Sequence, residues 1–392
     1  MVSEQFNALV FDLGSSSVRA GWAGHDQPKF IETSFLGRKS DGSLDPVPCR
    51  FLNSKRNNDA VTVHRAITFD HEISEWVVDK DCLAALSETL LYSSRGLQCL
   101  PAERPVFATC PTGASVDVKK AYYEHFMESA EVPAFFLGDT SVLAMYASGR
   151  VSGLCVDMGA SASIVAQVSR GQISDYAIHT TAGDVIDNFI LGRVDGIDAP
   201  SNLPESISEQ TRLAIVRELK HNACRCSHRA LPPPPTPSGL RSTRGTRKAA
   251  PLPSPTHKGE HAMFKLPDGT EVDVANVQEY AAEVIFAPTG EYPGLTAAVC
   301  EGLVGIEEEE KFVLLTGGSA HFHGLHTRLV NELDAALGVG KTSVFPFAQW
   351  THRVHSSFLG ASILASLSSF ASLWVTPASF LENGLDRILA QP

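Results

Sequence analysis

Residues 8–21 read Ala-Leu-Val-Phe-Asp-Leu-Gly-Ser-Ser-Ser-Val-Arg-Ala-Gly, and residues 153–165 repeat the pattern as Gly-Leu-Cys-Val-Asp-Met-Gly-Ala-Ser-Ala-Ser-Ile-Val. Each copy is a short apolar run, then Asp-x-Gly, then small side chains, then a second apolar run, which is the pattern of a β-hairpin. Asp12 and Asp157 lie 145 residues apart, about one domain length. The repeat therefore predicts two related α/β lobes that face one another.

The repeated hairpins also predict a ligand. A glycine turn lets backbone N–H groups converge on one point, with no Cβ in the way of an anion. Two such turns face to face would form a phosphate clamp, and Asp12 and Asp157 could hold the water shell of a Mg²⁺ ion that bridges the phosphates. A single Asp-x-Gly-x-Ser hairpin would more simply be a plain turn. The prediction of a phosphate site therefore depends on the presence of two copies. Further polar groups at the turns are Ser15, Ser16, Ser161 and Arg19.

A third glycine-rich element follows a strand-like run at residues 312–319, Phe-Val-Leu-Leu-Thr-Gly-Gly-Ser, and precedes an expected helix over 324–337. Paired glycines before a helix allow close approach of a flat ligand, although an ordinary strand–helix loop has the same pattern. Gly340-Lys341-Thr342 ends like a P-loop, but the first required glycine position holds Ala335. We therefore reject a P-loop there.

The composition is that of a folded protein: 392 residues, 43% apolar and 19% charged, large enough for two cores. The net charge of −12 argues against a protein that mainly wraps nucleic acid or lies on an anionic membrane. No apolar run reaches the ~18–20 residues of a membrane span, and the first residues do not resemble a signal peptide. We expect a soluble intracellular protein.

Residues 227–260 differ from the rest of the chain. They are rich in Pro, and residues 225–259 hold seven Arg or Lys and no acid. Such a segment buries too little apolar surface to fold, so we expect a disordered insertion on the second lobe. Arg244-Gly-Thr-Arg247-Lys248 could be an import signal or a weak contact to a phosphate backbone, and a solvated linker explains it as well.

The cysteines favour a reducing compartment, because the eight of them form no Cys-x-x-Cys pair. His221, Cys224, Cys226 and His228 have metal-ligand types, but one residue between two cysteines is tight for tetrahedral zinc, so we favour packing at a helix end. Glu307 to Glu310 reads as a solvated charge run. Apolar spacing predicts helices over 117–130 and 359–374, the latter stopped by Pro377.

These motifs resemble actin and the actin-related proteins, within the superfamily of sugar kinases and heat-shock ATPases. The resemblance rests on residues 9–15, 18–24, 146–150, 317–318 and 360–370. It implies the α/β actin-like ATPase fold, in which two duplicated ribonuclease-H-like cores surround a nucleotide cleft. The small lobe would be residues 1–149, with 351–392 returning to it, and the large lobe 150–350.

Within that family the chain looks most similar to the nuclear actin-related branch found in chromatin-remodelling and histone-acetyltransferase complexes. The motifs are Val10-Phe11-Asp12, residues 133–137, Asp157-x-Gly-Ala and Phe264-x-x-Pro-Asp-Gly. This resemblance implies a location in the nucleus, with the cytoplasm as a second location. It implies a helix of a remodelling ATPase or scaffold subunit as partner, actin as a further partner, weak contact of the basic insertion with histone or DNA, and no membrane.

The resemblance also assigns an ATP and Mg²⁺ site. The first phosphate loop would be Asp12, Gly14, Ser15 and Arg19, with Arg in place of actin's Lys, and the second would be Asp157, Gly159, Ala160 and Ser161. The nucleoside would be surrounded by Gly183, Lys220, Gly317, Gly318, Ser319 and Phe322. His221 replaces a glutamate that touches the ribose in actin, which weakens the expected affinity.

Departures from the family pattern predict slow or absent hydrolysis and no catalytic residue. The Gln and His that position the attacking water in actin align with Thr140 and Ile164, and an aspartate of the second loop has become Ala160. A methyl or apolar group cannot orient water or carry its proton. The region near Arg38 to Thr62, which matches actin's DNase-binding loop, is short and polar, so together with the insertion it predicts loss of polymerisation.

The family's partner groove lies between the lobes and takes an amphipathic helix. Here it would be lined by Tyr146, Gly149, Leu364, Leu367 and Leu373, for some of which core packing is an equal explanation. Two other functions stay open at this point. One is an active ATPase or phosphotransferase of the same superfamily, and the other is a divergent cytoskeletal actin-related protein.

Overall fold

The computed structural model describes residues 8–46, 60–197, 205–231, 262–266, 269–275, 277–307, 311–347 and 349–389. Its first sheet has the strand order β10-β9-β1-β2-β3. Strands β1, β2 and β3 pair antiparallel, and β1, β9 and β10 pair parallel. Their bounds are Leu9–Leu13 (β1), Ser17–Trp22 (β2), Phe30–Thr33 (β3), Val106–Cys110 (β9) and Phe135–Asp139 (β10).

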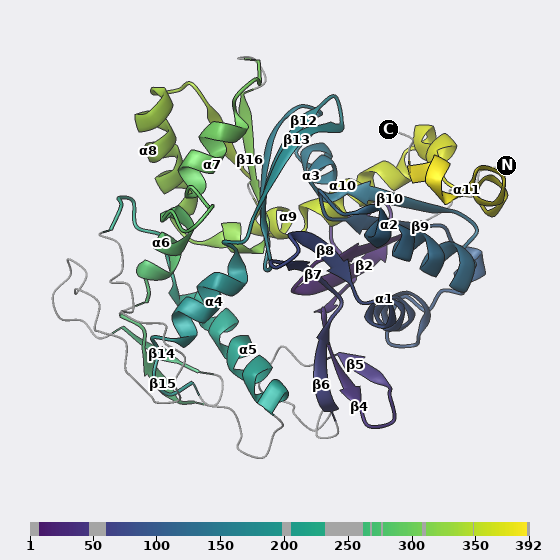
Figure 1. The fold of residues 1–392 in the computed structure, drawn as a ribbon, viewed down its shortest axis with the longest axis horizontal. Helices are drawn as coiled ribbons and strands as arrows, with labels where there is room; N and C mark the ends of the chain where they lie inside the picture. Colours follow the sequence, from purple (N-terminus) through teal and green to yellow (C-terminus); the bar gives the residue numbers. More distant parts are fainter. Residues whose placement is uncertain are drawn as a thin grey trace.

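The second sheet repeats this order and these directions, as β17-β16-β11-β12-β13 (Figure 1). The two sheets therefore confirm the predicted fold class, two related α/β lobes, and each lobe begins with one of the repeated hairpins. The bounds are Gly153–Met158 (β11), Ser163–Ser169 (β12), Gln172–His179 (β13), Phe312–Thr316 (β16) and Ser343–Pro346 (β17).

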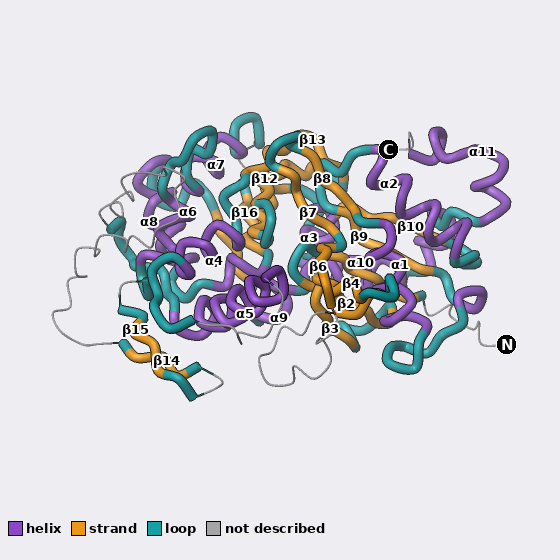
Figure 2. Tube along the Cα trace, turned by 60° about the horizontal axis from the view of Figure 1, so that its bottom comes forward, coloured by secondary structure: helices purple, strands orange, loops and turns teal. Residues whose placement is uncertain are grey.

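The strands of the two large sheets gather toward the middle of the molecule, with α6 and α8 on one side and α2 and α11 on the other (Figure 2). Smaller sheets extend the two lobes: β5-β4-β6 and β7-β8 on the first, and β14-β15 on the second. Their bounds are Phe35–Lys39 (β4), Leu44–Pro46 (β5), Ala60–Arg65 (β6), Ile67–Asp70 (β7), Glu75–Val78 (β8), Met263–Lys265 (β14) and Glu271–Asp273 (β15).

Helices cover both sheets. On the first lobe α1 is Lys80–Ser87 and is followed by a π-helical turn at Glu88–Tyr92, and a 3-10 turn spans Pro101–Glu103. Helix α2, Val116–Tyr123, continues as a π-helical turn over Glu124–Ser129, which confirms the helix predicted over 117–130. Helix α3, Thr140–Ala147, leads from the first sheet to the second.

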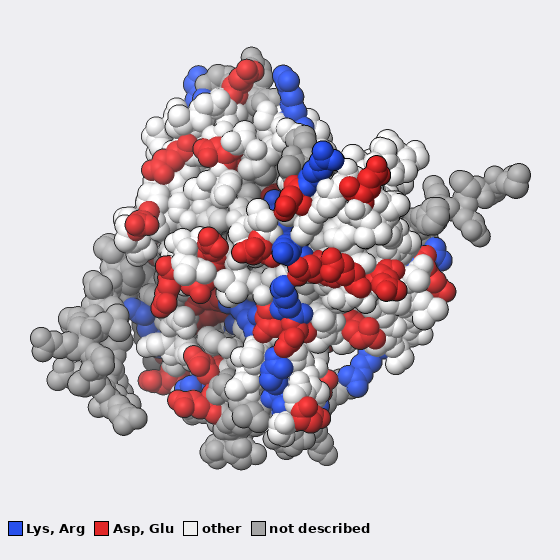
Figure 3. All heavy atoms as spheres, turned by 45° about the vertical axis from the view of Figure 1, so that its right-hand side comes forward, with Lys and Arg blue, Asp and Glu red and all other residues white. Residues whose placement is uncertain are grey.

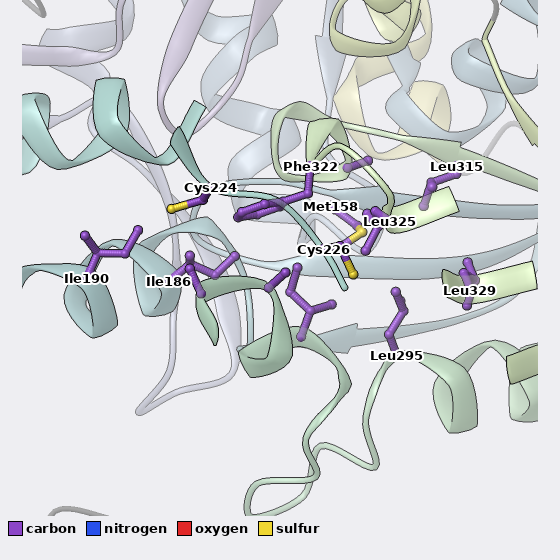
Figure 4. Close-up of a cluster of buried hydrophobic side chains, with 14 of the residues drawn as sticks. Met158, Ile186, Ile190, Cys224, Cys226, Leu295, Leu315, Phe322, Leu325 and Leu329 are labelled. Atoms are coloured by element: carbon purple, nitrogen blue, oxygen red, sulfur yellow. The ribbon is translucent and has the colours of Figure 1, made fainter. Parts of the chain in front are cut away.

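On the second lobe the helices are α4 Gly183–Leu191, α5 Glu205–Ala223, α6 Tyr280–Phe286, α7 Leu295–Gly302 and α8 Leu325–Leu337, the last confirming the helix expected over 324–337. Their apolar faces meet in one core, drawn in Figure 4. Phe322, Leu325 and Leu329 lie in it together with Met158 of the hairpin. Cys224 and Cys226 are buried in this same core, so they pack as small apolar side chains.

The C-terminal residues return to the first lobe. Helix α9 is Trp350–Val354 and α10 is Ser356–Ser366, and Phe358 and Ala361 of α10 pack on Val10 and Phe107 of the first sheet. Helix α10 also packs closely on α3, because a Cβ on Gly360 would lie 1.9 Å from the carbonyl oxygen of Leu143. Only glycine fits at that crossing.

The predicted helix over 359–374 is wrong at its C-terminal end. Helix α10 ends at Ser366, Leu367 is extended, and Ser368–Leu373 form a separate 3-10 turn. Pro377 does not stop the predicted helix but begins α11, Pro377–Leu389. A proline lacks the N–H that the first turn of a helix leaves unpaired, which suits it to that position.

Several predictions fall outside the described residues, namely most of the 227–260 insertion, much of the segment 38–62, and Glu308 to Glu310. Among the described helices none is long and apolar enough to cross a membrane. Acidic side chains spread over the face shown in Figure 3, interrupted by Lys and Arg, as the net charge of −12 leads one to expect.

Candidate functional site

The two hairpin turns meet. The backbone N–H of Ser161, in the second turn, donates a hydrogen bond to Ser15 Oγ, in the first, at 3.2 Å. Beside this contact lies a cavity of about 560 Å³, walled by both lobes. The volume lies in the range of small-molecule and cofactor sites. The opposed turns that the repeat predicts are therefore present and share one cavity.

Most residues predicted to bind the nucleotide lie around this cavity. Twelve of the fifteen line it: Asp12, Gly14, Ser15, Ser16, Arg19, Asp157, Gly159, Ala160, Lys220, Gly317, Gly318 and Ser319. The other three sit just behind the wall. The hydroxyl of Ser161 accepts from the N–H of Phe69, Gly183 packs against Ser319, and Phe322 belongs to the second-lobe core and touches a small adjoining pocket.

Asp12 is held by three side chains. Arg19, its cross-strand neighbour in the hairpin, forms an ion pair with it at 2.9 Å. Thr109 donates a hydroxyl hydrogen bond at 2.6 Å, and Ser357 Oγ lies 3.3 Å from both carboxylate oxygens. The carboxylate is almost fully buried. Its charge is balanced within the first hairpin.

Asp157 has no such counter-ion in its own hairpin. Its cross-strand neighbour, at the place that Arg19 takes in the first copy, is the apolar Ile164. Burial and the nearby Asp12 raise the pKa of Asp157 to about 6, and Arg19 offsets this only partly. The Asp157 carboxylate packs against Gly317. A Cβ at residue 317 would lie 2.5 Å from Asp157 Oδ1, and the backbone φ of Gly317 is +90°. Glycine is required there.

The carboxylates of Asp12 and Asp157 fit the divalent cation that the site prediction includes. Mg²⁺ prefers oxygen ligands and keeps several of its waters. The two acids line one cavity, and repulsion from Asp12 adds to burial in raising the pKa of Asp157. A cation near both would remove that repulsion, and bound there it would supply positive charge to phosphate oxygens.

The two positions expected to lack a water-positioning group do lie at the cavity. Thr140 lines it, and its hydroxyl is buried with no hydrogen-bond partner among the described residues. Ile164 also lines it and is 3% exposed. The side chains at Thr140 and Ile164 therefore cannot act as a base toward water. Of the acids at the wall, Asp187 is ion-paired with Lys220 at 2.6 Å and with Arg217 at 3.1 Å.

The far end of the cavity is built from α5 and the third glycine element. Ser319 Oγ donates to the carbonyl of Gly159 at 2.9 Å, and Lys220 Nζ donates to the carbonyl of Gly183 at 3.3 Å. A Cβ on Gly183 would lie 2.7 Å from Ser319 Oγ, so this glycine lets the two segments touch. His221, Asn222 and His321 complete the wall.

Some residues at the site were missed by sequence reasoning. Arg217, Asp187 and Ser357 line the cavity, and Arg65 and Asp184 lie at its edge through their contacts. None belongs to a local motif, because the five residues are spread over four elements, and only Asp184 and Asp187 share one, helix α4. The available signals were two pairs at three-residue spacing on a helix, Asp184 with Asp187 and Arg217 with Lys220.

The residues predicted to line the partner groove are of two kinds, some packed in the protein and some exposed. Leu364 packs on the first-lobe core, and Tyr146 on α3 is half-buried. Leu367 and Leu373 are 47% and 54% exposed, and Gly149 is exposed too. Core packing thus accounts for Leu364, whereas Leu367 and Leu373 leave apolar surface uncovered.

The histidine and cysteine side chains at the end of α5 do not form a metal site. The described residues include no group of three or more His, Cys, Asp or Glu that could hold a metal ion. In Figure 4 the sulfur atoms of Cys224 and Cys226 lie apart, each among apolar side chains. The packing interpretation therefore holds for both cysteines.

Comparison with known proteins matches nearly the whole chain. The family model described as Actin matches residues 3–391. The chain is similar to actin-like protein 7B of Rattus norvegicus, at 26% identity over 405 residues that cover 99% of this chain and 88% of that protein. It is also similar to actin-like protein 7B of Mus musculus, at 25% identity with the same coverage.

Proposed function

The chain belongs to the actin family, and we propose that it is a non-polymerising assembly subunit that holds ATP between its lobes and docks a helix of a partner protein. The nucleotide serves mainly as a structural clip, because a ligand that touches both lobes stabilises their closed arrangement by its binding free energy. The chain hydrolyses it little.

The observation that carries nucleotide binding is the pair of opposed turns joined by Ser161 and Ser15 at one cavity. Backbone N–H groups at the glycine turns suit phosphate oxygens. Arg19 and Lys220 add positive charge on opposite walls, one from each lobe. Asp12 and Asp157 would hold Mg²⁺, which screens the phosphates from these acids.

Slow hydrolysis is supported by the side chains that line the same cavity. Thr140 and Ile164 offer no group that takes a proton from water. Asp12 is committed to Arg19 and Thr109, and Asp187 to Lys220 and Arg217. This arrangement favours retention of an intact triphosphate over turnover.

Partner docking is supported by the exposed Leu367 and Leu373 that follow α10. An amphipathic helix would cover this apolar surface. We place the complex in the nucleus, among chromatin-remodelling or histone-acetyltransferase assemblies, on the motif similarity at Val10-Phe11-Asp12 and Phe264-x-x-Pro-Asp-Gly. The basic residues of 225–259 would favour contact with DNA or a histone surface.

Affinity purification of the tagged full chain, followed by mass spectrometry, tests this proposal. We expect stoichiometric subunits of one nuclear chromatin complex and a monomeric chain. The purified chain should stay in the supernatant on high-speed centrifugation with ATP, Mg²⁺ and KCl. Filaments in the pellet, or co-purification with cytoskeletal proteins alone, would instead support a divergent cytoskeletal actin-related protein.

A further inference from the structure

A bidentate ion pair crosses from one lobe to the other beside the cavity. Arg65, at the end of β6, contacts both carboxylate oxygens of Asp184 on α4, at 2.5 and 3.3 Å. Arg65 Nε also donates to the backbone carbonyl of Ser15 in the first glycine turn. One guanidinium therefore joins the second lobe to the loop at the cavity.

The ion pair continues as a row of alternating charges into the second lobe. Arg217 on α5 lies 3.9 Å from Asp184 and 3.1 Å from Asp187. Asp187 in turn pairs with Lys220 at 2.6 Å, and Lys220 lines the cavity. The position of the Lys220 ammonium is thus linked to Arg65 through three side chains, those of Asp184, Arg217 and Asp187.

An aromatic ring fixes the two guanidinium groups. Phe35 on β4 lies 4.8 Å from the guanidinium carbon of Arg65 and 4.7 Å from that of Arg217, measured to the ring centroid. Arg65, Asp184 and Arg217 are 17%, 28% and 16% exposed. Partly buried charges of this kind interact more strongly than surface pairs do.

The contacts of Arg65 with Asp184 and of Phe35 with Arg217 join elements that belong to different lobes. Figure 1 shows β4 and β6 on one side of the lower half of the molecule and α4 and α5 on the other. Pairing through side chains that still reach water can break and re-form without unfolding either lobe, because water replaces the lost partners. This is the behaviour of a latch, not of a core contact.

We propose that Arg65 and Asp184 form a latch that keeps the cleft closed and slows the release of the bound nucleotide. The inference rests on the proposed function for its ligand and adds how that ligand is retained. Breaking the pair lets α4 and α5 move away from β6, which opens the cavity. Arg217 and Asp187 act as positioning residues for Lys220.

Nucleotide release tests the latch directly. The full chain is loaded with the fluorescent analogue mant-ATP, and its dissociation is followed by stopped flow after mixing with excess ATP. Asp184→Asn and Arg65→Gln should each raise the dissociation rate about fivefold. The double variant should release the nucleotide at nearly the same rate as either single variant, because both substitutions remove the same interaction. Arg38→Gln is the matched control, because it breaks the Arg38–Asp81 pair at 2.9 Å within the first lobe. Its release rate should equal that of the wild type.

Hydrogen–deuterium exchange of the nucleotide-free chain separates failure of the latch from failure of nucleotide binding. Peptides covering residues 12–18 and 157–164 should exchange about fivefold faster in Asp184→Asn and Arg65→Gln than in wild type and Arg38→Gln. If mant-ATP does not bind at all, the proposed function fails, while faster exchange still supports the latch. Unchanged exchange and unchanged release in both latch variants would overturn it.

Discussion

The N–H of Ser161 and the hydroxyl of Ser15 are joined by a hydrogen bond across 146 residues of chain, in the interior of the protein. This contact fixes the two glycine turns against each other and sets the width of the cavity between the lobes.

ATP turnover by the purified chain should be at least about 100-fold below that of an ordinary ATPase, because loss of a positioned base costs about 10²–10⁴ in rate. Phosphate release in the presence of Mg²⁺ measures it. The double variant Thr140→Gln, Ile164→His restores side chains that can hold water at the cavity wall. Turnover should rise in that variant, and rapid turnover by the wild type would contradict the structural-clip proposal.

Asp157→Arg should abolish nucleotide binding, measured by titration with mant-ATP. The new side chain would fill the space between the turns and displace the cation that the acid would hold. Asp175→Arg is the control, since Asp175 is an exposed acid on the same sheet. Its affinity should match the wild type. Equal affinity in Asp157→Arg would mean that the nucleotide binds elsewhere.

The raised pKa of Asp157, about 6 because of burial and Asp12, predicts a pH-dependent stability. A raised carboxyl pKa means that the fold favours the neutral acid, so the penalty is full above pH 6 and absent below about pH 4. Asp157→Asn removes the charge. Without nucleotide, we expect it to stabilise the chain by on the order of 1 kcal/mol at pH 7.5, and by much less at pH 4. Thermal unfolding of both proteins at the two pH values measures this, and an equal difference at both would contradict it.

The fold was predictable because its signal is local and repeated. Asp12 and Asp157 each stand in an apolar run with a glycine two residues later, and the repetition of this pattern indicates a buried hairpin in each lobe. The end of α10 was not predictable from spacing alone, because the apolar periodicity continues through Phe370, which packs on the first-lobe core from a separate turn.

The latch shows why part of the site escaped sequence reasoning. Arg65, Asp184 and Arg217 lie on three elements, and their pairing depends on how the lobes sit against each other. Single charged residues on a strand and two helices give no pattern in one sequence. The glycines and serines of the turns did give one, because backbone geometry itself restricts which residues fit there.

Gly360→Ala should destabilise the chain by about 3 kcal/mol, near the upper range for overpacking, because the new Cβ would lie 1.9 Å from the carbonyl of Leu143. Helices α3 and α10 would have to separate, which disturbs Phe358 and the core beneath it. Chemical denaturation measures the loss. Ser366→Ala, at the exposed end of the same helix, is the control and should change stability by less than about 0.5 kcal/mol.

Leu367→Glu should release the helical partner while leaving the chain folded. Leu367 is 47% exposed and lies just after α10, so a carboxylate there can stay in water in the free protein but would be buried under a docked helix. Co-purification with the tagged variant measures the loss of the partner, and thermal unfolding checks the fold. Leu381→Glu, on α11 and 83% exposed, is the control for an added charge at an apolar surface residue. Full retention of the partner by Leu367→Glu would show that the helix docks on another surface.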